Sequence, residues 1–188
     1  TTTQDMTVNG VTVGKGSGTG DQNTVVGEGA LVSNTASNNT AVGKGALNIN
    51  ATGSENTAVG KDALKGNTTS SNNVAVGNEA SYTGTTAERN TAVGYQALYS
   101  NTGNQSTAVG YQAGRDVTIG LYGTYIGYLA GANVTTGSYN VALGRSSLTT
   151  NTTGTSNTAL GTEALNSNDT ANNNTAVGYQ AAYTGVGG

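Results

Sequence analysis

Cysteine, histidine, proline, phenylalanine and tryptophan are all absent from this chain of 188 residues. Without cysteine there is no disulfide, and the lack of both cysteine and histidine excludes a usual zinc site or a His-activated nucleophile. Charge is scarce as well, with seven Lys and Arg against ten Asp and Glu. The carboxylates do not recur at one place in the sequence, so no paired general acid and base is indicated. We therefore expect no enzyme and no cofactor.

Long apolar runs and basic clusters are also lacking. No stretch of about 18 apolar residues occurs, so we expect no membrane insertion, and scattered Lys and Arg argue against nucleic-acid binding. Val, Ile and Leu together number 30, which is low for an ordinary globular core. The net charge of −3 is nevertheless too small for a typical disordered chain. Gly, Asn, Thr, Ala and Ser dominate instead, a composition that suits short strands joined by turns.

One motif recurs along the chain with a 17-residue period. Segments 39–47, 56–64 and 90–98 read NTAVGKGAL, NTAVGKDAL and NTAVGYQAL. Alignment on the motif glycine gives the series Gly14, Gly27, Gly43, Gly60, Gly77, Gly94, Gly110, Gly127, Gly144, Gly161 and Gly178. The intervals between successive glycines are 13, 16, 17, 17, 17, 16, 17, 17, 17 and 17. This regularity predicts a repeat architecture with a degenerate first copy.

Positions in each repeat are numbered here from this glycine, so that −1 precedes it and +1 follows it. Position −1 is aliphatic and position −3 is Thr or Val, with a small residue, usually Ala, between them, which predicts a short strand. The glycine is expected to take a positive φ at a bend between two short strands. Recurring glycines and the lack of a 3.6-residue apolar stripe exclude a helical repeat.

Stacked coils account for this pattern best. We predict an all-β fold, a parallel β-solenoid or β-roll of about ten 17-residue coils. Residues 1–22 are assigned to a degenerate first coil and N-terminal lead-in, residues 23–182 to the β-roll repeats, and residues 183–188 to a Gly-rich tail. Thin coils bury little surface per chain, and small cores often gain stability by oligomerising.

Two columns of stacked side chains are expected to hold the coils together. The aliphatic residues at −1 should form a buried column, and the Asn residues at −4 should form another at a turn, where amides bond to one another and cap strand edges. The central members are Val59, Val76 and Val93 in the first column and Asn56, Asn73 and Asn90 in the second. In the spacers, Asn50 and Asn67 begin Asn-x-Thr sequons and are candidates for glycans, although such matches arise easily in an Asn- and Thr-rich chain.

The coil pattern [ST]-x-[AV]-[ILV]-G-x-x-[AS] resembles the head repeats of trimeric autotransporter adhesins. Those heads are left-handed parallel β-rolls with one repeat per coil, assembled as homotrimers. The segments MTVNGVTVGKG at 6–16 and NTAVGYQAL at 90–98 also resemble phage tail-fibre proteins. Coils of the adhesin family are shorter, so the spacers here are expected to bulge outward. For this chain the resemblance implies a left-handed β-roll, assembly as a homotrimer, and an extracellular location on a virion tail or a cell surface.

The leading functional hypothesis is a structural and adhesive segment of a surface fibre, a phage tail fibre or a bacterial adhesin head, that mediates attachment. One alternative is an extracellular filament subunit that polymerises end to end through open strand edges. A remote alternative is an ice-binding solenoid that uses the Thr column at −3, although Val74 and Val141 interrupt that column. In either of the first two cases the expected partner is the chain itself.

A contact site for a host-surface glycan or protein is predicted at positions +1 and +2. Tyr95, Tyr111 and Tyr128 follow consecutive motif glycines, so their rings should form an outward ladder at the coil spacing. Gln96 and Gln112 stand beside two of them. Aromatic faces with amide neighbours suit sugar rings, whereas stacking of Tyr on a pleated surface explains the same recurrence without a ligand.

Overall fold

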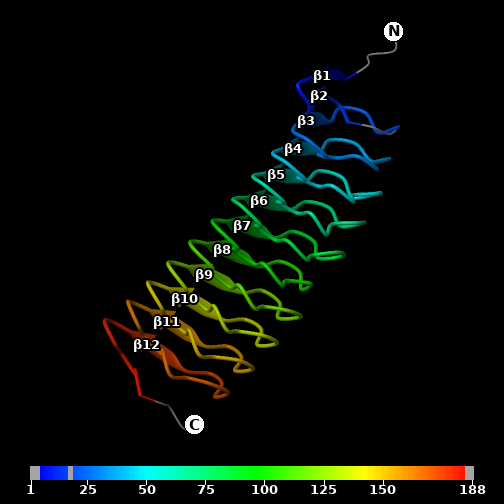
Figure 1. Cartoon of the computed structure of the whole chain (residues 1–188). Helices are drawn as coiled ribbons and strands as arrows, with labels where there is room; N and C mark the ends of the chain where they lie inside the picture. Colours follow the sequence, from blue (N-terminus) through cyan, green and yellow to red (C-terminus); the bar gives the residue numbers. More distant parts are fainter. Residues whose placement is uncertain (1–4, 17–18, 185–188) are drawn as a thin grey trace.

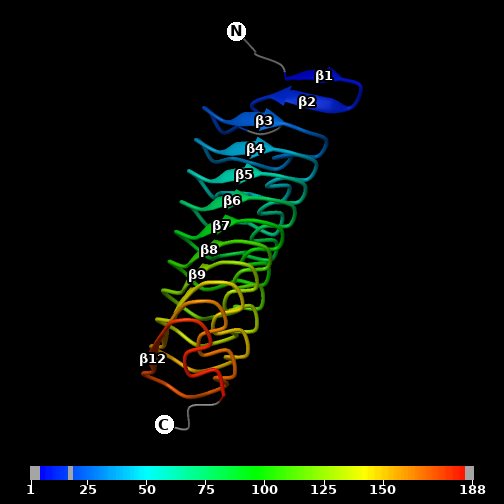
Figure 2. The ribbon, with the colours of Figure 1, turned by 90° about the vertical axis from the view of Figure 1, so that its left-hand side faces the viewer.

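The computed structural model describes residues 5–16 and 19–184, and this part of the chain consists of strands and turns, with no helix that could cross a membrane. All its strands belong to one sheet and follow one another in chain order. Figures 1 and 2 show them stacked coil upon coil into a rod, with β1 and β12 at opposite ends. The strands are β1 (Met6–Val8), β2 (Val11–Gly14), β3 (Thr24–Val26), β4 (Thr40–Val42), β5 (Thr57–Val59), β6 (Val74–Val76), β7 (Thr91–Val93), β8 (Thr107–Val109), β9 (Thr124–Ile126), β10 (Val141–Leu143), β11 (Thr158–Leu160) and β12 (Thr175–Val177).

Strand pairing follows the spacing of the motif glycines. Val74 of β6 pairs in parallel with Thr57 of β5 and with Thr91 of β7, each one full repeat away in the sequence. Thr91 pairs in turn with Thr107 of β8, across one of the shorter repeats, as the spacing of the glycines requires. The predicted parallel β-solenoid of 17-residue coils is therefore confirmed. Nine steps of about 4.8 Å from β3 to β12 give this parallel stack a length of roughly 43 Å.

The first copy of the motif is a hairpin rather than the degenerate coil expected from the sequence. β1 and β2 are antiparallel and joined by Asn9 and Gly10, whose φ angles of 49° and 81° fit the two-residue turn that Asn-Gly favours. β2 then pairs antiparallel with β3, where Val13 lies opposite Val26. The shortest interval between motif glycines, Gly14 to Gly27, thus connects two antiparallel strands rather than two parallel coils. Most of the expected Gly-rich tail, residues 185–188, lies outside the described residues.

The inner face of each strand is the opposite of the one predicted. Val59, Val76 and Val93 do stack in register, but they point outward, and Val76 is 36% exposed. The residue at −2 points inward instead, as Ala75 and Ala92 illustrate with no exposed surface. Alternation over three residues assigns the side chains to two sides of the strand, but it does not identify the side that packs against the core. Here the coil is too narrow for a larger residue than Ala at most −2 positions.

The rest of the core comes from Ala at +3 and Leu at +4, and the described chain has no second strand after the glycine. Leu47, Leu64 and Leu98 are buried and have φ angles of 48–50°. This left-handed conformation costs roughly 1–2 kcal/mol for a residue with a Cβ, a cost that burial of the Leu side chain offsets. The bend predicted at the glycine is therefore followed by a tight turn that drives Leu into the interior.

One coil has a large residue at −2, where most coils have Ala. Tyr125 in β9 is fully buried, and a Cβ at Gly123, Gly114 or Gly131 would come within 2.8 Å of its ring. The last two glycines occupy the +4 position, which holds Leu in most other coils. The aromatic ring thus fills the volume that two Leu side chains vacate. Burial raises the pKa of the Tyr125 hydroxyl, which has no hydrogen-bond partner among the described residues.

The motif glycines are required for two reasons, which Gly94 illustrates. Its φ of 132° lies in a region that residues with a Cβ rarely adopt. A Cβ at this position would also lie 2.3 Å from the carbonyl oxygen of Gly110 in the next coil. Gly178 shares the positive φ, at 125°, but a Cβ added there would meet nothing within 4 Å among the described residues. The recurring glycine therefore permits both the bend and the close stacking of coils.

Replacing Gly94 by Ala is expected to destabilise the solenoid more than replacing Gly178 by Ala. Both variants carry the backbone strain of about 1–3 kcal/mol, but only Gly94→Ala adds a steric clash with the next coil. Thermal unfolding followed by circular dichroism measures the difference. Equal melting temperatures for the two variants would show that inter-coil crowding does not restrict this position.

Tyr125→Phe is expected to raise the unfolding free energy by about 1–2 kcal/mol, because it removes a buried hydroxyl that lacks a partner and keeps the ring. Tyr122→Phe is the matched control, since Tyr122 is 43% exposed, and its effect should stay within about 0.5 kcal/mol. Urea denaturation of both variants provides the measurement. A loss of stability in Tyr125→Phe would contradict this account of the core.

Candidate functional site

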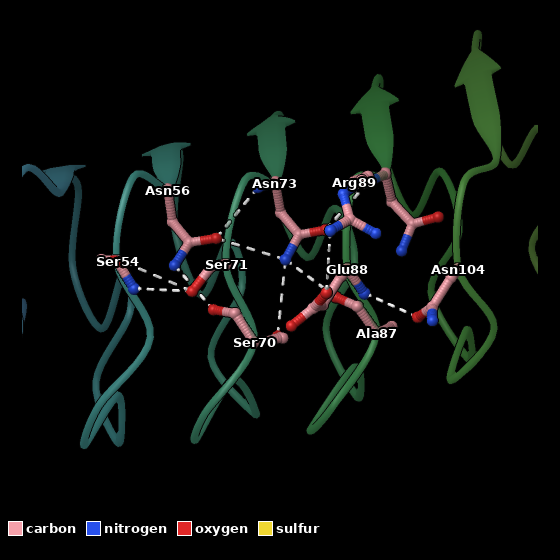
Figure 3. Close-up of polar contacts among 10 residues, drawn as sticks. Ser54, Asn56, Ser70, Ser71, Asn73, Ala87, Glu88, Arg89 and Asn104 are labelled. Atoms are coloured by element: carbon pink, nitrogen blue, oxygen red, sulfur yellow. Dashed lines mark hydrogen bonds and ion pairs between the residues drawn. The ribbon is translucent and has the colours of Figure 1, made fainter.

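The Asn residues at −4 form a buried column along the start of the strands, as Figure 3 shows for Asn56 and Asn73. The Oδ1 of Asn56 accepts a hydrogen bond of 3.0 Å from the backbone N–H of Asn73 in the next coil. The Oδ1 of Asn73 accepts one of 2.9 Å from the N–H of Asn90. In addition, the Nδ2 of Asn73 donates across its own coil to the carbonyl of Ala87, at 2.8 Å. Each amide therefore joins two coils and also braces the interior of its own.

A second Asn column, at position +7, was not recognised from the sequence. The Nδ2 of Asn67 donates to the Oδ1 of Asn50 in the preceding coil, at 2.7 Å, and also to the carbonyl of Ser70, at 3.1 Å. Asn56 donates to that same Ser70 carbonyl from the other side of the coil. The recurrence of Asn seven residues after the motif glycine was the available signal. Six coils have this arrangement, in which two amides meet on one carbonyl: Asn23/Asn34, Asn39/Asn50, Asn56/Asn67, Asn90/Asn101, Asn140/Asn151 and Asn157/Asn168.

The two sequons in the spacers are poor glycan acceptors in this fold. Asn50 and Asn67 have no exposed surface. The Nδ2 atom that a glycan would modify is already a donor inside the coil, to Asn34 and Gly53 in the case of Asn50. These two candidate positions are therefore inaccessible to a glycan in the folded chain, because the +7 side chain points into the core.

The tyrosines at +1 form a stacked row on the outside of the coils. The ring centroids of Tyr95 and Tyr111 are 5.2 Å apart with an interplanar angle of 17°, and those of Tyr111 and Tyr128 are 5.2 Å apart at 11°. Their exposed fractions are 40–50%. The stacked rings cover one another's faces, so the surface offered to solvent consists mainly of ring edges and hydroxyl groups. The outward direction and the stacking are those expected from the sequence.

The glutamines beside these tyrosines form a hydrogen-bonded row of their own. The Nε2 of Gln112 donates to the Oε1 of Gln96, and the Nε2 of Gln96 donates to the Oε2 of Glu79, both at 2.8 Å. At the other end of the row, Arg115 lies 3.5 Å from the Oε1 of Gln112. The row thus runs from a cation to an anion. The Nε2 groups of both glutamines donate hydrogen bonds to the preceding coil, so fewer amide hydrogens are available to a ligand than the sequence suggested.

Two further tyrosine pairs were not anticipated as pairs. Tyr82 and Tyr99 at +5 have centroids 5.1 Å apart and planes within 4°, and Lys65 lies 5.6 Å from the Tyr82 ring centroid. Burial raises the pKa of Tyr99, and the nearby Glu79 adds to the rise. Tyr122 and Tyr139 at −5 are 4.9 Å apart with planes within 10°. Aligning the spacers residue by residue, as the motif was aligned, would have brought these partners together.

The outward face of the strands is an uncharged surface. It consists of the −3 column, which is Thr or Val, and the −1 column, which is Val, Ile or Leu, over all the strands from β3 to β12. Neither column contains a charged residue. Ion pairs lie on other edges, such as Lys44 with Glu28 at 3.0 Å and Arg145 with Glu163 at 2.9 Å. We call these two columns the strand face.

Within residues 5–16 and 19–184, no group of three or more acidic side chains could hold a metal ion. The chain matches no protein-family model, no curated protein and no solved structure. Its resemblance to adhesin heads and tail fibres therefore depends on the repeat pattern and on the β-solenoid alone.

Asn73→Ala is expected to lower the unfolding free energy by roughly 2–4 kcal/mol, because the N–H of Asn90 and the carbonyl of Ala87 would each lose a partner in a buried setting. Asn78→Ala is the control, since the side chain of Asn78 donates an exposed hydrogen bond to the carbonyl of Lys61. Urea denaturation measures stability, and amide hydrogen exchange reports protection of the Asn90 N–H. Similar stability of the two variants would indicate that the column contributes little.

Proposed function

We propose that this chain is a structural segment of an extracellular fibre, in which copies of the chain lie side by side through the strand face. The observation that carries the proposal is the composition of that face. Apolar side chains at −1 remain 36–42% exposed in Val76, Val109, Ile126, Leu143 and Leu160, and no charge interrupts them. Depletion of charge at a well-packed apolar surface is typical of the centre of a protein interface, and a continuous exposed apolar surface marks an interaction site.

The N-terminal hairpin extends the same face. Val13 lies opposite Val26, whose side chain points outward, so the two share one side of the sheet. Met6, Val8 and Val11 lie on that side as well, by cross-strand pairing and by alternation, and all are exposed. An uncharged surface with apolar side chains from every strand therefore runs from β1 to β12. Such continuity is expected of a surface that one long partner covers along the whole rod.

A copy number of three is our proposal from the resemblance to trimeric adhesin heads. Three rods that run in parallel would bury their strand faces around a common axis, while the spacer loops and the +1 and +5 edges would face outward. A fibre of this kind suits a virion tail or a cell surface, where a stiff rod displays binding loops at a distance.

End-to-end polymerisation is less compatible with the N-terminal geometry. β2 covers the free edge of β3 and runs antiparallel to it. A second chain could not continue the parallel stack on β3 unless this hairpin moved aside. Lateral assembly needs no such rearrangement.

Val76→Lys is expected to convert the assembly to a folded monomer of 18.5 kDa, because it places a charge at the centre of the strand face, where burial of an unpaired charge is costly. Thr69→Lys is the matched control, with the same added charge on an exposed spacer loop, and it should keep the parental mass. Light scattering after size exclusion gives the masses, and circular dichroism verifies the fold. A wild-type chain that is monomeric at all concentrations would refute lateral assembly.

An attachment role is proposed for the tyrosine row at +1, with a host-surface glycan as the ligand. Stacking leaves ring edges, hydroxyl groups and the two outermost ring faces available, and these suit the C–H faces and hydroxyl rims of sugars. The double variant Tyr95→Ala/Tyr111→Ala is expected to retain assembly and to lose binding to cells or to polysaccharide. Unchanged binding by the folded double variant would leave the row with a structural role only.

The strand face also favours one competing function. Its Thr column, interrupted by Val74 and Val141, lies beside a regular aliphatic column on one parallel sheet, so the outward surface has two ranks of side chains. Two ranks of this kind on a flat sheet are compatible with ice binding. Thermal hysteresis shown by a monomeric chain would select this function over lateral assembly.

A further inference from the structure

Seven of the ten tyrosines are arranged in stacked pairs, each formed by residues of adjacent coils. The centroid separations are 4.9–5.2 Å and the interplanar angles are at most 17°. The pairs are Tyr82–Tyr99, Tyr95–Tyr111, Tyr111–Tyr128 and Tyr122–Tyr139. They occupy three different columns of the solenoid, so the arrangement is not peculiar to one edge.

The remaining three tyrosines show that solvent exposure and ring stacking vary independently in this molecule. Tyr179 is 72% exposed but stacks on no other ring in the described chain, and Tyr183 is likewise exposed and unstacked. Tyr125 is fully buried. The molecule therefore contains exposed tyrosines with a stacked neighbour and exposed tyrosines without one. Chemistry that needs two phenols close together will distinguish them, whereas chemistry that needs only access will not.

We propose that the stacked pairs are sites of oxidative tyrosine coupling, which links neighbouring coils covalently. A peroxide-consuming one-electron oxidant removes one electron and one proton from each of two phenols. The two phenoxyl radicals join through the ring carbons next to their hydroxyl groups, and the hydrogens on these carbons then move to the oxygens. Overall, two tyrosines and one hydrogen peroxide give one dityrosine and two waters.

The solenoid holds the reacting groups together by its register. The partners are a whole repeat apart in the chain, yet inter-coil hydrogen bonds keep their backbones in adjacent coils, as the bond from the N–H of Gln112 to the carbonyl of Tyr95 does at 2.8 Å. Such proximity makes coupling intramolecular and favours it over encounters between chains. The rings are only partly covered, so each can rotate about its side-chain bonds until the two reactive carbons meet.

A bridge of this kind would act on stability much as a disulfide does. It closes a loop of about one coil, and a cross-link that closes such a loop restricts the unfolded chain more than the folded one. For a rod whose coils contact only their neighbours, a covalent link between adjacent coils opposes local opening. A cysteine-free chain would gain covalent reinforcement through its phenols instead.

The experiment treats the purified chain with a haem peroxidase and hydrogen peroxide over a range of protein concentrations. Dityrosine fluorescence and peptide mass mapping after denaturation locate the bridges. We expect peptides joined within one chain at the stacked pairs, each lighter by two hydrogen atoms, with a yield that is independent of protein concentration. The melting temperature of the treated chain should rise.

Two variants sharpen the test. Tyr111→Phe should abolish both links in the +1 row and leave those at Tyr82–Tyr99 and Tyr122–Tyr139 unchanged. Tyr179→Phe, which removes the most exposed tyrosine, should not reduce the intramolecular yield. The proposal is overturned if coupling occurs mainly at Tyr179 and between chains, with a yield that rises with concentration. It is also overturned if the stacked pairs are oxidised without becoming linked.

Discussion

Hydrogen bonds from one coil to the next are the interaction on which the rest of this structure depends. They occur on every side of the coil. The N–H of Thr57 in the strand donates to Asn73 in the following coil, the N–H of Gly60 donates back to Val42, and the N–H of Leu47, beyond the corner, donates forward to Ala63. Bonds in both directions and on several sides hold the coils in register, and only a register of this kind lets Asn amides, glutamines and tyrosines stack on their copies. The apolar core alone is too thin to specify such an arrangement, since Ala fills most of its inner strand positions.

The spacing of the glycines predicted the fold and the register, because each coil of a solenoid follows the same backbone path and so needs a glycine at the same position. The inner face was harder to predict. Val at −1 is more hydrophobic than Ala at −2, so transfer free energy alone would place Val76 inside and Ala75 outside. The available volume decides otherwise, because Leu64 and its equivalents enter from the opposite wall through a left-handed turn that a Leu side chain does not favour. At the candidate site, the row of Tyr95, Tyr111 and Tyr128 could be predicted from one aligned column, whereas Tyr82 and Tyr139 belonged to spacers that look irregular until the coils are stacked.

The coils around Tyr125 show how much variation this register tolerates. Where the ring enters the core, Leu is replaced by Gly at two +4 positions, and Val117 and Val134 replace Asn at +7 in the same coils. The polar bracing of the interior is exchanged for apolar filling over a short length, while the strands continue without a break. Compensation therefore acts between residues that are close in space and about one coil apart in the sequence. A comparison restricted to neighbouring residues would miss it.

Three rows of side-chain amides share one orientation. In the Asn column at −4, in the Asn column at +7 and in the glutamine row, the oxygen of the earlier coil accepts from the nitrogen of the later one. The carbonyl dipoles of these amides consequently point the same way along the rod, and their partial charges add rather than cancel. The β12 end presents acceptors, among them the buried Oδ1 of Asn168, which has no partner in the described part of the chain. These three rows thus contribute a dipole along the rod that is negative toward β12, and in two rods side by side in parallel the rows would repel each other weakly, a repulsion that the contacts along the rods must outweigh.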